Sequence, residues 1–260
     1  MKSLKKIIAS NKFSLFLRKF LDIKSPKLLV PSFSSNVSIS DAFFWRTDNE
    51  FETVFRYTDL LKFFYGEKSS FVRVVFYDSS NQFIKELKIN IKNSSGEVLI
   101  NKKLLNNIEG YGSFFIFHET KKKQSSNIQK KVIIRNSCYT GYSKNNQNPS
   151  FVHGNIPTIG KDIIGSHYYF NFSQWNGFKN NTYILQNNFK SFDKSELCFI
   201  NPMSKSLSLN VNDTKYLIKK HNSIIVPIKN VSLCKIQSNC SFIRPIIFNY
   251  SKQYYDVYHG

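Results

Sequence analysis

The clearest structural signal in the chain is Phe71-Val-Arg-Val-Val-Phe-Tyr-Asp-Ser-Ser-Asn-Gln-Phe-Ile-Lys-Glu-Leu-Lys-Ile-Asn-Ile91. Its first seven residues form a nearly continuous apolar run, which suits a central strand. The polar residues 78–81 have the composition of a turn. Phe83, Leu87, Ile89 and Ile91 then share one face of a second strand. We therefore predict an antiparallel hairpin over residues 71–91.

Similar patterns extend to both sides of this hairpin. Apolar and polar residues alternate over residues 51–57 and 207–211, and residues 111–118 are strongly apolar. Alanine, the best helix former, occurs only at Ala9 and Ala42, whereas aromatic residues make up 16% of the chain. The expected fold class is all-β, with one or two antiparallel β-sandwiches, immunoglobulin-like or jelly-roll-like, and a short N-terminal amphipathic helix.

The expected organisation has three parts. Residues 1–35 form a basic leader, residues 36–160 a first β-sandwich, and residues 161–260 a second, whose C-terminus packs back on the first. In the leader, apolar residues from Phe13 to Leu21 follow a helical spacing. This helix either makes peripheral contact with an anionic membrane through residues 1–30, or docks on the β body or frays.

No run reaches the ~20 apolar residues that a membrane span requires, and no signal peptide is evident. These observations predict a cytoplasmic protein, with a peripheral position at the inner membrane face as the alternative.

The net charge is +20, which raises the question of nucleic-acid binding. The lysines are spread along the chain, and residues 121–123 are the only run of three. This distribution favours a solvated basic surface and makes a nucleic-acid partner unlikely.

The four cysteines contain no CxxC pair, so neither a zinc ribbon nor a thioredoxin-type site is indicated. We expect four buried free thiols. The alternative is a Cys234–Cys240 disulfide in an oxidising compartment.

The usual signatures of enzymes are missing from the sequence. It has no phosphate-binding P-loop, no GxGxxG after a strand, no HExxH and no GxSxG. The sequence therefore favours a non-catalytic protein, and we assign no catalytic residue.

The first candidate ligand-binding group lies in Ser40-Asp-Ala-Phe-Phe-Trp-Arg46. The group comprises Asp41, Trp45 and Arg46, with Glu52 a few residues further on. The Trp45 ring stacks on the C–H face of a sugar, while the arginine and the carboxylates bind its hydroxyl or acid groups. The alternative is a Trp in the core with an Arg–Asp pair at its edge.

The second candidate group lies in residues 136–155, where aromatic, glycine and ionisable residues are interleaved. Tyr139, Tyr142, His153 and Asn155 are its candidate ligand-binding residues. The segment is either the rim of a binding site or a polar loop that joins two β domains.

Three histidines end or follow aromatic-rich segments: His118, His153 and His259. If the sheet ends converge, these residues would bind a divalent transition metal, with Glu119 as a fourth ligand or base. The alternative is that each histidine bonds a loop carbonyl.

The chain also resembles an uncharacterised family of bacterial β-rich proteins found beside surface-polysaccharide genes. The likeness rests on Ser40–Arg46, Phe51-Glu-Thr53, Gly110-Tyr-Gly112, Phe117-His118, Tyr139-Thr-Gly-Tyr142, Phe151-Val-His-Gly-Asn155 and Tyr255-Asp-Val-Tyr-His259. It covers about residues 38–155 and the C-terminus. The family has no assigned activity, so the resemblance implies a glycan-related context and supplies no catalytic residue. It draws attention to Arg46, His118, Tyr142, His153, Asn155 and His259.

Together these observations predict a non-catalytic β-sandwich protein that binds a glycan or a polysaccharide-assembly protein in cell-surface polysaccharide biosynthesis, without a cofactor. The alternative is a metal-dependent enzyme that acts on a sugar or nucleotide-sugar through the three histidines.

Overall fold

The computed structural model describes residues 37–59, 62, 68–90, 93–120, 138–145, 147–154, 156–163, 166–171, 180–185, 188–201, 206–240, 243–252 and 254–260. Of residues 37–41, 118–120 and 156–171 it describes the course of the backbone. The predicted N-terminal helix and the membrane contact of residues 1–30 lie outside the described residues. Among those described, no helix is long and apolar enough to cross a membrane.

The elements bounded in the described part are strands and one 3-10 turn, η1 (Phe189–Ser191), so the predicted all-β class is confirmed. All of its strand pairs are antiparallel, and the strands form four sheets. Sheet I has six strands in the order β10-β9-β1-β6-β3-β4, and sheet II has the order β5-β2-β7-β8. Sheet III has the order β15-β12-β17-β18, and sheet IV has the order β11-β16-β13-β14.

The strands of sheet I are β1 (Val37–Arg46), β3 (Ser70–Asp78), β4 (Phe83–Asn90), β6 (Tyr111–Thr120), β9 (Ile156–Ile163) and β10 (Ser166–Asn171). Those of sheet II are β2 (Phe51–Thr58), β5 (Ser95–Ile100), β7 (Tyr139–Lys144) and β8 (Ser150–His153). Sheet III contains β12 (Lys194–Ile200), β15 (Ser223–Ile228), β17 (Ile246–Tyr250) and β18 (Tyr255–His259). Sheet IV contains β11 (Asn181–Leu185), β13 (Leu207–Val211), β14 (Thr214–Ile218) and β16 (Cys234–Ser238).

The predicted hairpin over residues 71–91 is confirmed as β3 and β4, which pair from Phe71 opposite Asn90 to Tyr77 opposite Phe83. At the turn, one carboxylate oxygen of Asp78 accepts hydrogen bonds from the backbone N–H groups of Ser80 and Gln82. These bonds stabilise the turn together with two backbone hydrogen bonds, from the N–H of Asp78 to the carbonyl of Gln82 and from the N–H of Asn81 to the carbonyl of Asp78.

Eight consecutive residues of β3, Ser70 to Tyr77, are buried. Because consecutive residues of a strand point to opposite faces of the sheet, both faces of β3 are covered. Val72, Val74 and Phe76 face a core between sheets I and II, which also contains Phe55 of β2. The opposite face of sheet I contributes to a second core, shared with sheet III. The third core lies between sheets III and IV.

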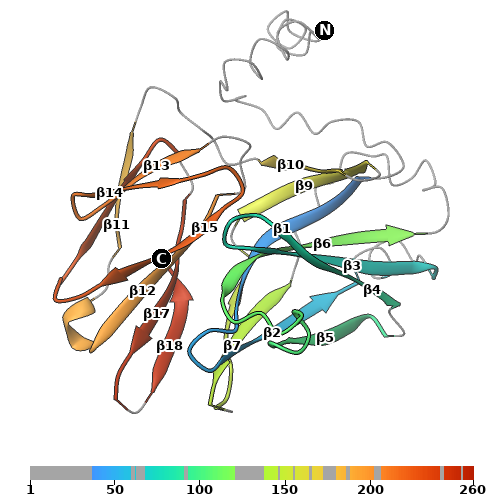
Figure 1. The fold of residues 1–260 in the computed structure, drawn as a ribbon, viewed down its shortest axis with the longest axis horizontal. Coiled ribbons are helices and arrows are strands. Elements are labelled where there is room, and N and C mark those ends of the chain that lie inside the picture. The colour runs from blue at the N-terminus through green and yellow to red at the C-terminus, as the bar shows by residue number, and fades with distance from the viewer. Residues whose placement is uncertain are drawn as a thin grey trace, which may run out of the picture.

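The four sheets therefore follow one another face to face (Figure 1). Sheets I and II form the first half of the chain, sheets III and IV form the second half, and the two halves share the second core. This corrects the expectation of one or two immunoglobulin-like or jelly-roll-like sandwiches, since the small sheets are set more like the four blades of a β-propeller. Sheets I and II take alternating strands from the first half of the chain. The hairpin of β9 and β10 extends sheet I past residue 160, where the sequence suggested a boundary.

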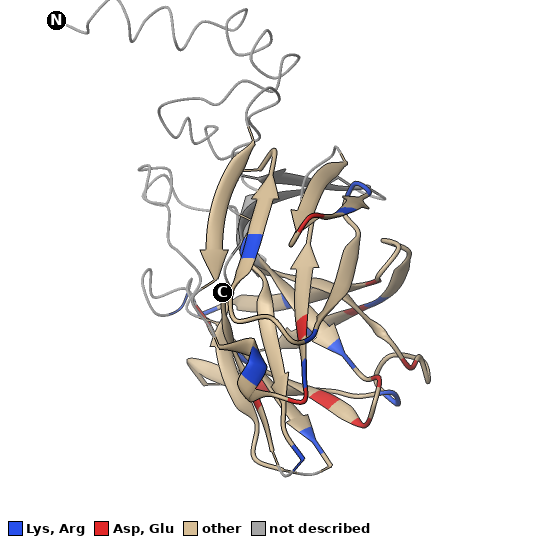
Figure 2. Cartoon of the chain, turned by 90° about the vertical axis from the view of Figure 1, so that its left-hand side faces the viewer, with Lys and Arg blue, Asp and Glu red and all other residues tan. Residues whose placement is uncertain are grey.

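Two compositional predictions can be compared with this fold. All four cysteines are free and buried, as expected. Basic and acidic residues of the described part are interspersed along its strands and loops, which is the distribution of a solvated surface (Figure 2).

Candidate functional site

Two aromatic residues that the sequence placed at a ligand surface belong to the interior. Trp45 is fully buried, and its Nε1–H donates to the carbonyl of Tyr77 at 2.8 Å. Tyr142 is also fully buried, and its hydroxyl donates to the carbonyl of Phe44 at 2.9 Å. Burial raises the pKa of Tyr142 well above its ordinary value. These side chains do not meet solvent, so their assignment to ligand binding is corrected.

Arg46 is fully buried as well, at the junction of the two halves. Its guanidinium forms two parallel bonds of 2.9 Å with Asp48 and a third of 2.9 Å with Glu196 of β12. It also lies over the rings of Phe51 and Phe248, at 4.2 and 4.7 Å from their centroids. The alternative of a Trp in the core is thus confirmed. The Arg–Asp pair is formed with Asp48 and lies on the opposite face of β1 from the Trp45 ring. Asp41 lies opposite Pro157 of β9 in the backbone register of sheet I.

Glu196 completes this buried junction. Its carboxylate accepts hydrogen bonds from the Tyr250 hydroxyl at 2.6 Å and from the ammonium group of Lys194 at 2.5 Å. Burial alone would raise the pKa of Glu196, but Arg46, Lys194 and Tyr250 together hold it below its ordinary value. The carboxylate is therefore ionised at neutral pH, and the junction is a buried ion network that joins β1 to β12.

The three histidines predicted as metal ligands are divided between two regions. His153 of β8 and His259 of β18 lie in contact, with ring centroids 4.3 Å apart. His118 lies opposite Val72 in sheet I, near the end of β6. In Figure 1 this strand ends on the side of the molecule away from β18. The described residues contain no cluster of three or more metal-binding side chains.

The more ordinary interpretation of two histidines is confirmed. Nδ1 of His153 bonds the carbonyl of Gly154 at 2.9 Å, and Nε2 of His259 bonds the carbonyl of His153. Asn155 lies outside the described residues.

Two of the predicted ligand-binding residues do meet at a surface. Tyr139 and His153 are directly opposite each other on β7 and β8. Both are exposed, on the face of sheet II that points away from its core. Arg56 of β2 is the next residue in the same row, and Glu97 of β5 pairs with it at 2.7 Å.

The neighbouring row of sheet II is apolar. Phe151 lies over Gly141, where an added Cβ would come within 2.6 Å of the ring. The guanidinium of Arg56 stacks on this ring at 4.3 Å from its centroid. Leu99 of β5 is 46% exposed at the far side of the row. The glycine thus lets an aromatic ring lie flat on the sheet.

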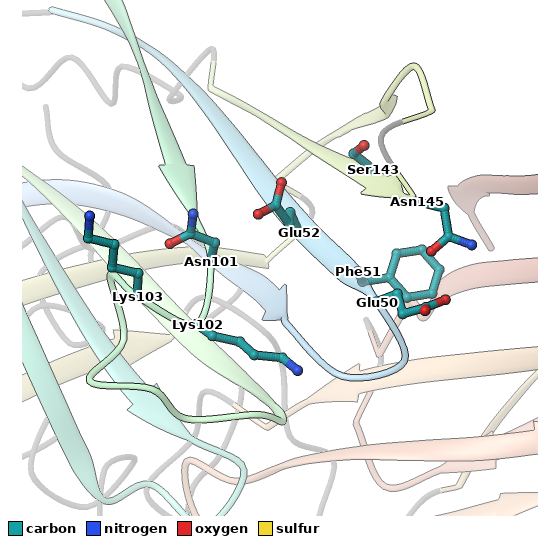
Figure 3. Close-up of a pocket in the computed structure, with 8 residues that line it drawn as sticks. All are labelled: Glu50, Phe51, Glu52, Asn101, Lys102, Lys103, Ser143 and Asn145. Carbon is teal, nitrogen blue, oxygen red and sulfur yellow. The ribbon is translucent and has the colours of Figure 1, made fainter.

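A groove of about 370 Å³ lies at the end of this face, next to the loop after β5 (Figure 3). Its lining residues are Glu50, Phe51, Glu52, Asn101, Lys102, Lys103, Ser143 and Asn145. Figure 3 shows the Glu52 carboxylate between Asn101 on one side and Ser143 on the other. The groove therefore offers carboxylate, amide, hydroxyl and ammonium groups within one concave surface.

Within the described ranges, the Glu52 carboxylate has no hydrogen-bond or ion-pair partner, although Ser143 of β7 lies directly opposite Glu52 in the sheet. Asn101 is oriented by its Oδ1, which accepts from the backbone N–H of Leu104 at 3.0 Å. Its two amide hydrogens remain available to a ligand. Lys102 is paired with Glu109 at 2.7 Å, outside the lining of the groove.

The sequence grouped Glu52 with Trp45 and Arg46 as sugar-binding residues, but it did not predict the groove in which Glu52 lies. Glu52 carried a usable signal, because it alternates with Phe51 and Thr53 and must face away from the core. Asn101 and Lys103 come from a loop whose position over sheet II has no local sequence signature.

Comparison with known proteins identifies no relative of the chain. No protein family and no curated protein matches it. Solved structures similar to it include an anti-sigma factor domain-containing protein, with 8% identity, 90% of this chain and 85% of that chain covered, and a TM-score of 0.22. Another is the extracellular domain of ANXUR2 from Arabidopsis thaliana, with 8% identity, 85% and 83% coverage, and a TM-score of 0.22. Likenesses at this level carry no argument.

Proposed function

We propose that this protein is a non-catalytic glycan-binding protein of cell-surface polysaccharide biosynthesis, and that the glycan lies across the outer face of sheet II. The groove around Glu52 binds one sugar of the chain. Tyr139, which is 48% exposed, supplies an aromatic face farther along the sheet. The surface-polysaccharide context rests on the sequence resemblance alone.

The observation that carries this proposal is the Glu52 carboxylate, which has no partner among the described residues and lies between an oriented amide and the Ser143 hydroxyl. That hydroxyl donates to the carbonyl of Gln147 at 2.6 Å and can still accept a hydrogen bond. A carboxylate accepts hydrogen bonds from sugar hydroxyl groups, and an amide N–H₂ donates to them. Bonds to a charged group are the stronger kind, worth about 1.5–3 kcal/mol each. The groove thus offers both donors and acceptors, which a polyhydroxylated ligand requires.

The length of the face fits an oligosaccharide better than a single sugar. Glu52 and Arg56, which stands in the row of Tyr139, are four positions apart on β2. At about 3.3 Å per residue this corresponds to roughly 13 Å. Sugar C–H groups pack on an exposed aromatic ring, so a chain that starts in the groove can reach Tyr139.

The test is a glycan array followed by calorimetric titration with the best oligosaccharide. Glu52→Gln keeps the shape of the side chain and removes its charge, so we expect a loss of affinity of about 10-fold or more. Tyr139→Ala should weaken the same ligand. Leu217→Ala, an exposed position of sheet IV, is the matched control and should leave the affinity unchanged. Failure to bind any glycan, or equal affinity in the Glu52→Gln variant, would contradict the proposal.

A further inference from the structure

We propose that the glycan bound by sheet II is acidic, and that Arg56 binds its carboxylate or phosphate group. This inference rests on the proposed function and adds the chemical class of the ligand. It is drawn from the guanidinium of Arg56, which is held in place on the outer face of sheet II with most of its donors unused. The side chain is 57% exposed, so a ligand on this face can reach it.

Two contacts fix the position of the guanidinium. Its Nε–H donates to the carboxylate of Glu97, directly opposite on β5, at 2.7 Å. Its central carbon lies 4.3 Å from the centroid of the Phe151 ring. That ring can lie flat there because its neighbour on β7 is Gly141, where a Cβ would come within 2.6 Å of it. The guanidinium is thus oriented before a ligand arrives, which reduces the entropy lost on binding.

The hydrogen-bond donors of Arg56 are only partly used. A guanidinium has several N–H donors and no acceptor. The bond to Glu97 uses Nε, and among the described residues Nη1 and Nη2 have no hydrogen-bond partner. Two parallel N–H bonds from a guanidinium match the two oxygens of a carboxylate or a phosphate. The two unused nitrogens therefore favour an anionic group over a single neutral hydroxyl.

Arg56 lies on the path proposed for the glycan. It is directly opposite Tyr139 on the adjacent strand, and the Tyr139 ring is the aromatic face proposed to pack against a sugar. Sugar C–H groups cover such a ring, while the substituents at the edge of the sugar stay free for polar contacts. A sugar on Tyr139 can therefore place an acidic substituent next to the guanidinium.

The charges around this face favour an acid at Arg56 and a neutral sugar in the groove. The carboxylate of Glu52 disfavours an acidic group in the groove itself. Arg56 lies roughly 13 Å farther along β2, beyond the Debye length of about 8 Å at physiological ionic strength, so this repulsion is largely screened there. Glu97 offsets part of the charge of Arg56, but the net charge of +20 on the chain attracts anionic ligands from solution.

The experiment uses the full chain and pairs of oligosaccharides that differ in one acidic group. Each uronic-acid oligosaccharide is paired with a form whose carboxyl group is reduced to an alcohol, and each phosphorylated one with its dephosphorylated form. An array ranks the pairs, and calorimetric titration measures both members of the best pair. We expect the acidic member to bind about 10-fold more tightly or better, as hydrogen bonds to a charged group do. The pair that shows the preference identifies the acid as carboxylate or phosphate.

Variants of Arg56 assign the preference to its guanidinium. Arg56→Gln should abolish the preference for the acidic member and leave the affinity for the neutral member nearly unchanged. Arg56→Lys keeps the charge without the two parallel donors, so it should retain only part of the preference. Lys215→Gln, at an exposed position of β14 in sheet IV, removes the same charge elsewhere and is the matched control, with the full preference expected.

The outcomes separate this inference from the proposed function. Equal affinity for both members of every pair, or a preference that survives in Arg56→Gln, would overturn the inference. If a neutral oligosaccharide binds and Glu52→Gln weakens it, the proposed function stands and the acidic ligand alone is rejected. If no oligosaccharide of the array binds, both are rejected.

Discussion

Replacement of Arg46 by methionine tests the buried junction between the two halves. Methionine fills much of the volume of the arginine stem but supplies no charge and no donor. Glu196, only 5% exposed, would then lose its bond to the guanidinium, and Asp48 would lose both of its own. Because the Glu196 carboxylate remains buried, it must be paired differently or protonated.

The expected cost follows from the groups that are left behind. Removing one partner of a buried ion pair costs about 3–5 kcal/mol. Here Lys194 and Tyr250 still contact Glu196, and Asp48 is 21% exposed and can be hydrated. We therefore expect a loss at the lower end of that range, about 3 kcal/mol. The double variant Arg46→Met/Glu196→Gln removes the orphaned charge and should recover more than half of this loss.

Urea unfolding of the wild type, both single variants and the double variant measures these differences as a double-mutant cycle. The pH dependence adds a second check. The pKa of Glu196 is lowered in the folded protein, so its contribution to stability is present above pH 4.5 and is lost as pH falls through the folded-state pKa. The wild type should thus lose its advantage over Arg46→Met in acid. A cost below about 1 kcal/mol at pH 7, or additive single effects, would refute the reasoning.

Three further predictions concern other parts of the interior. Trp45→Phe should lower the free energy of unfolding by about 1–3 kcal/mol in urea, because the carbonyl of Tyr77 loses its buried donor, while glycan affinity stays unchanged. Gly112→Ala should yield little soluble protein, since its Cβ would lie 2.1 Å from that same carbonyl, which belongs to a paired strand and cannot yield. The thiol of Cys198 should not react with a disulfide reagent until urea unfolds the chain, because burial raises its pKa and excludes the reagent.

The sequence predicted individual strands well and their assembly poorly. The hairpin of β3 and β4 was predictable because its apolar run, turn residues and second strand are all local in the chain. The strand over residues 111–118 was found for the same reason. How four sheets stack depends on contacts between distant segments, such as Phe51 with Phe248 at 5.5 Å between ring centroids, and no local pattern records those contacts.

The errors at the candidate site have one physical origin. In β1, Trp45 and Arg46 point in opposite directions, yet both are buried, because this part of sheet I is covered on both faces. The alternation of polar and apolar residues normally identifies the exposed face of a strand, but residues 42–47 of this segment have no exposed face. Tyr139 and His153 were selected in the same way and lie on an open face of sheet II, where alternation is informative. A polar residue beside an aromatic one therefore does not by itself indicate a ligand surface.

The alternation of sheets I and II along the chain has a consequence for synthesis on the ribosome. β1 pairs with β6 on one side and with β9 on the other, so its second neighbour emerges only after more than a hundred further residues. Until then β1 has an unpaired edge that can join the strand of another molecule. Slower elongation would prolong this exposure, so yield in the cell should depend more on the rate of translation and on chaperones than on the stability of the finished protein.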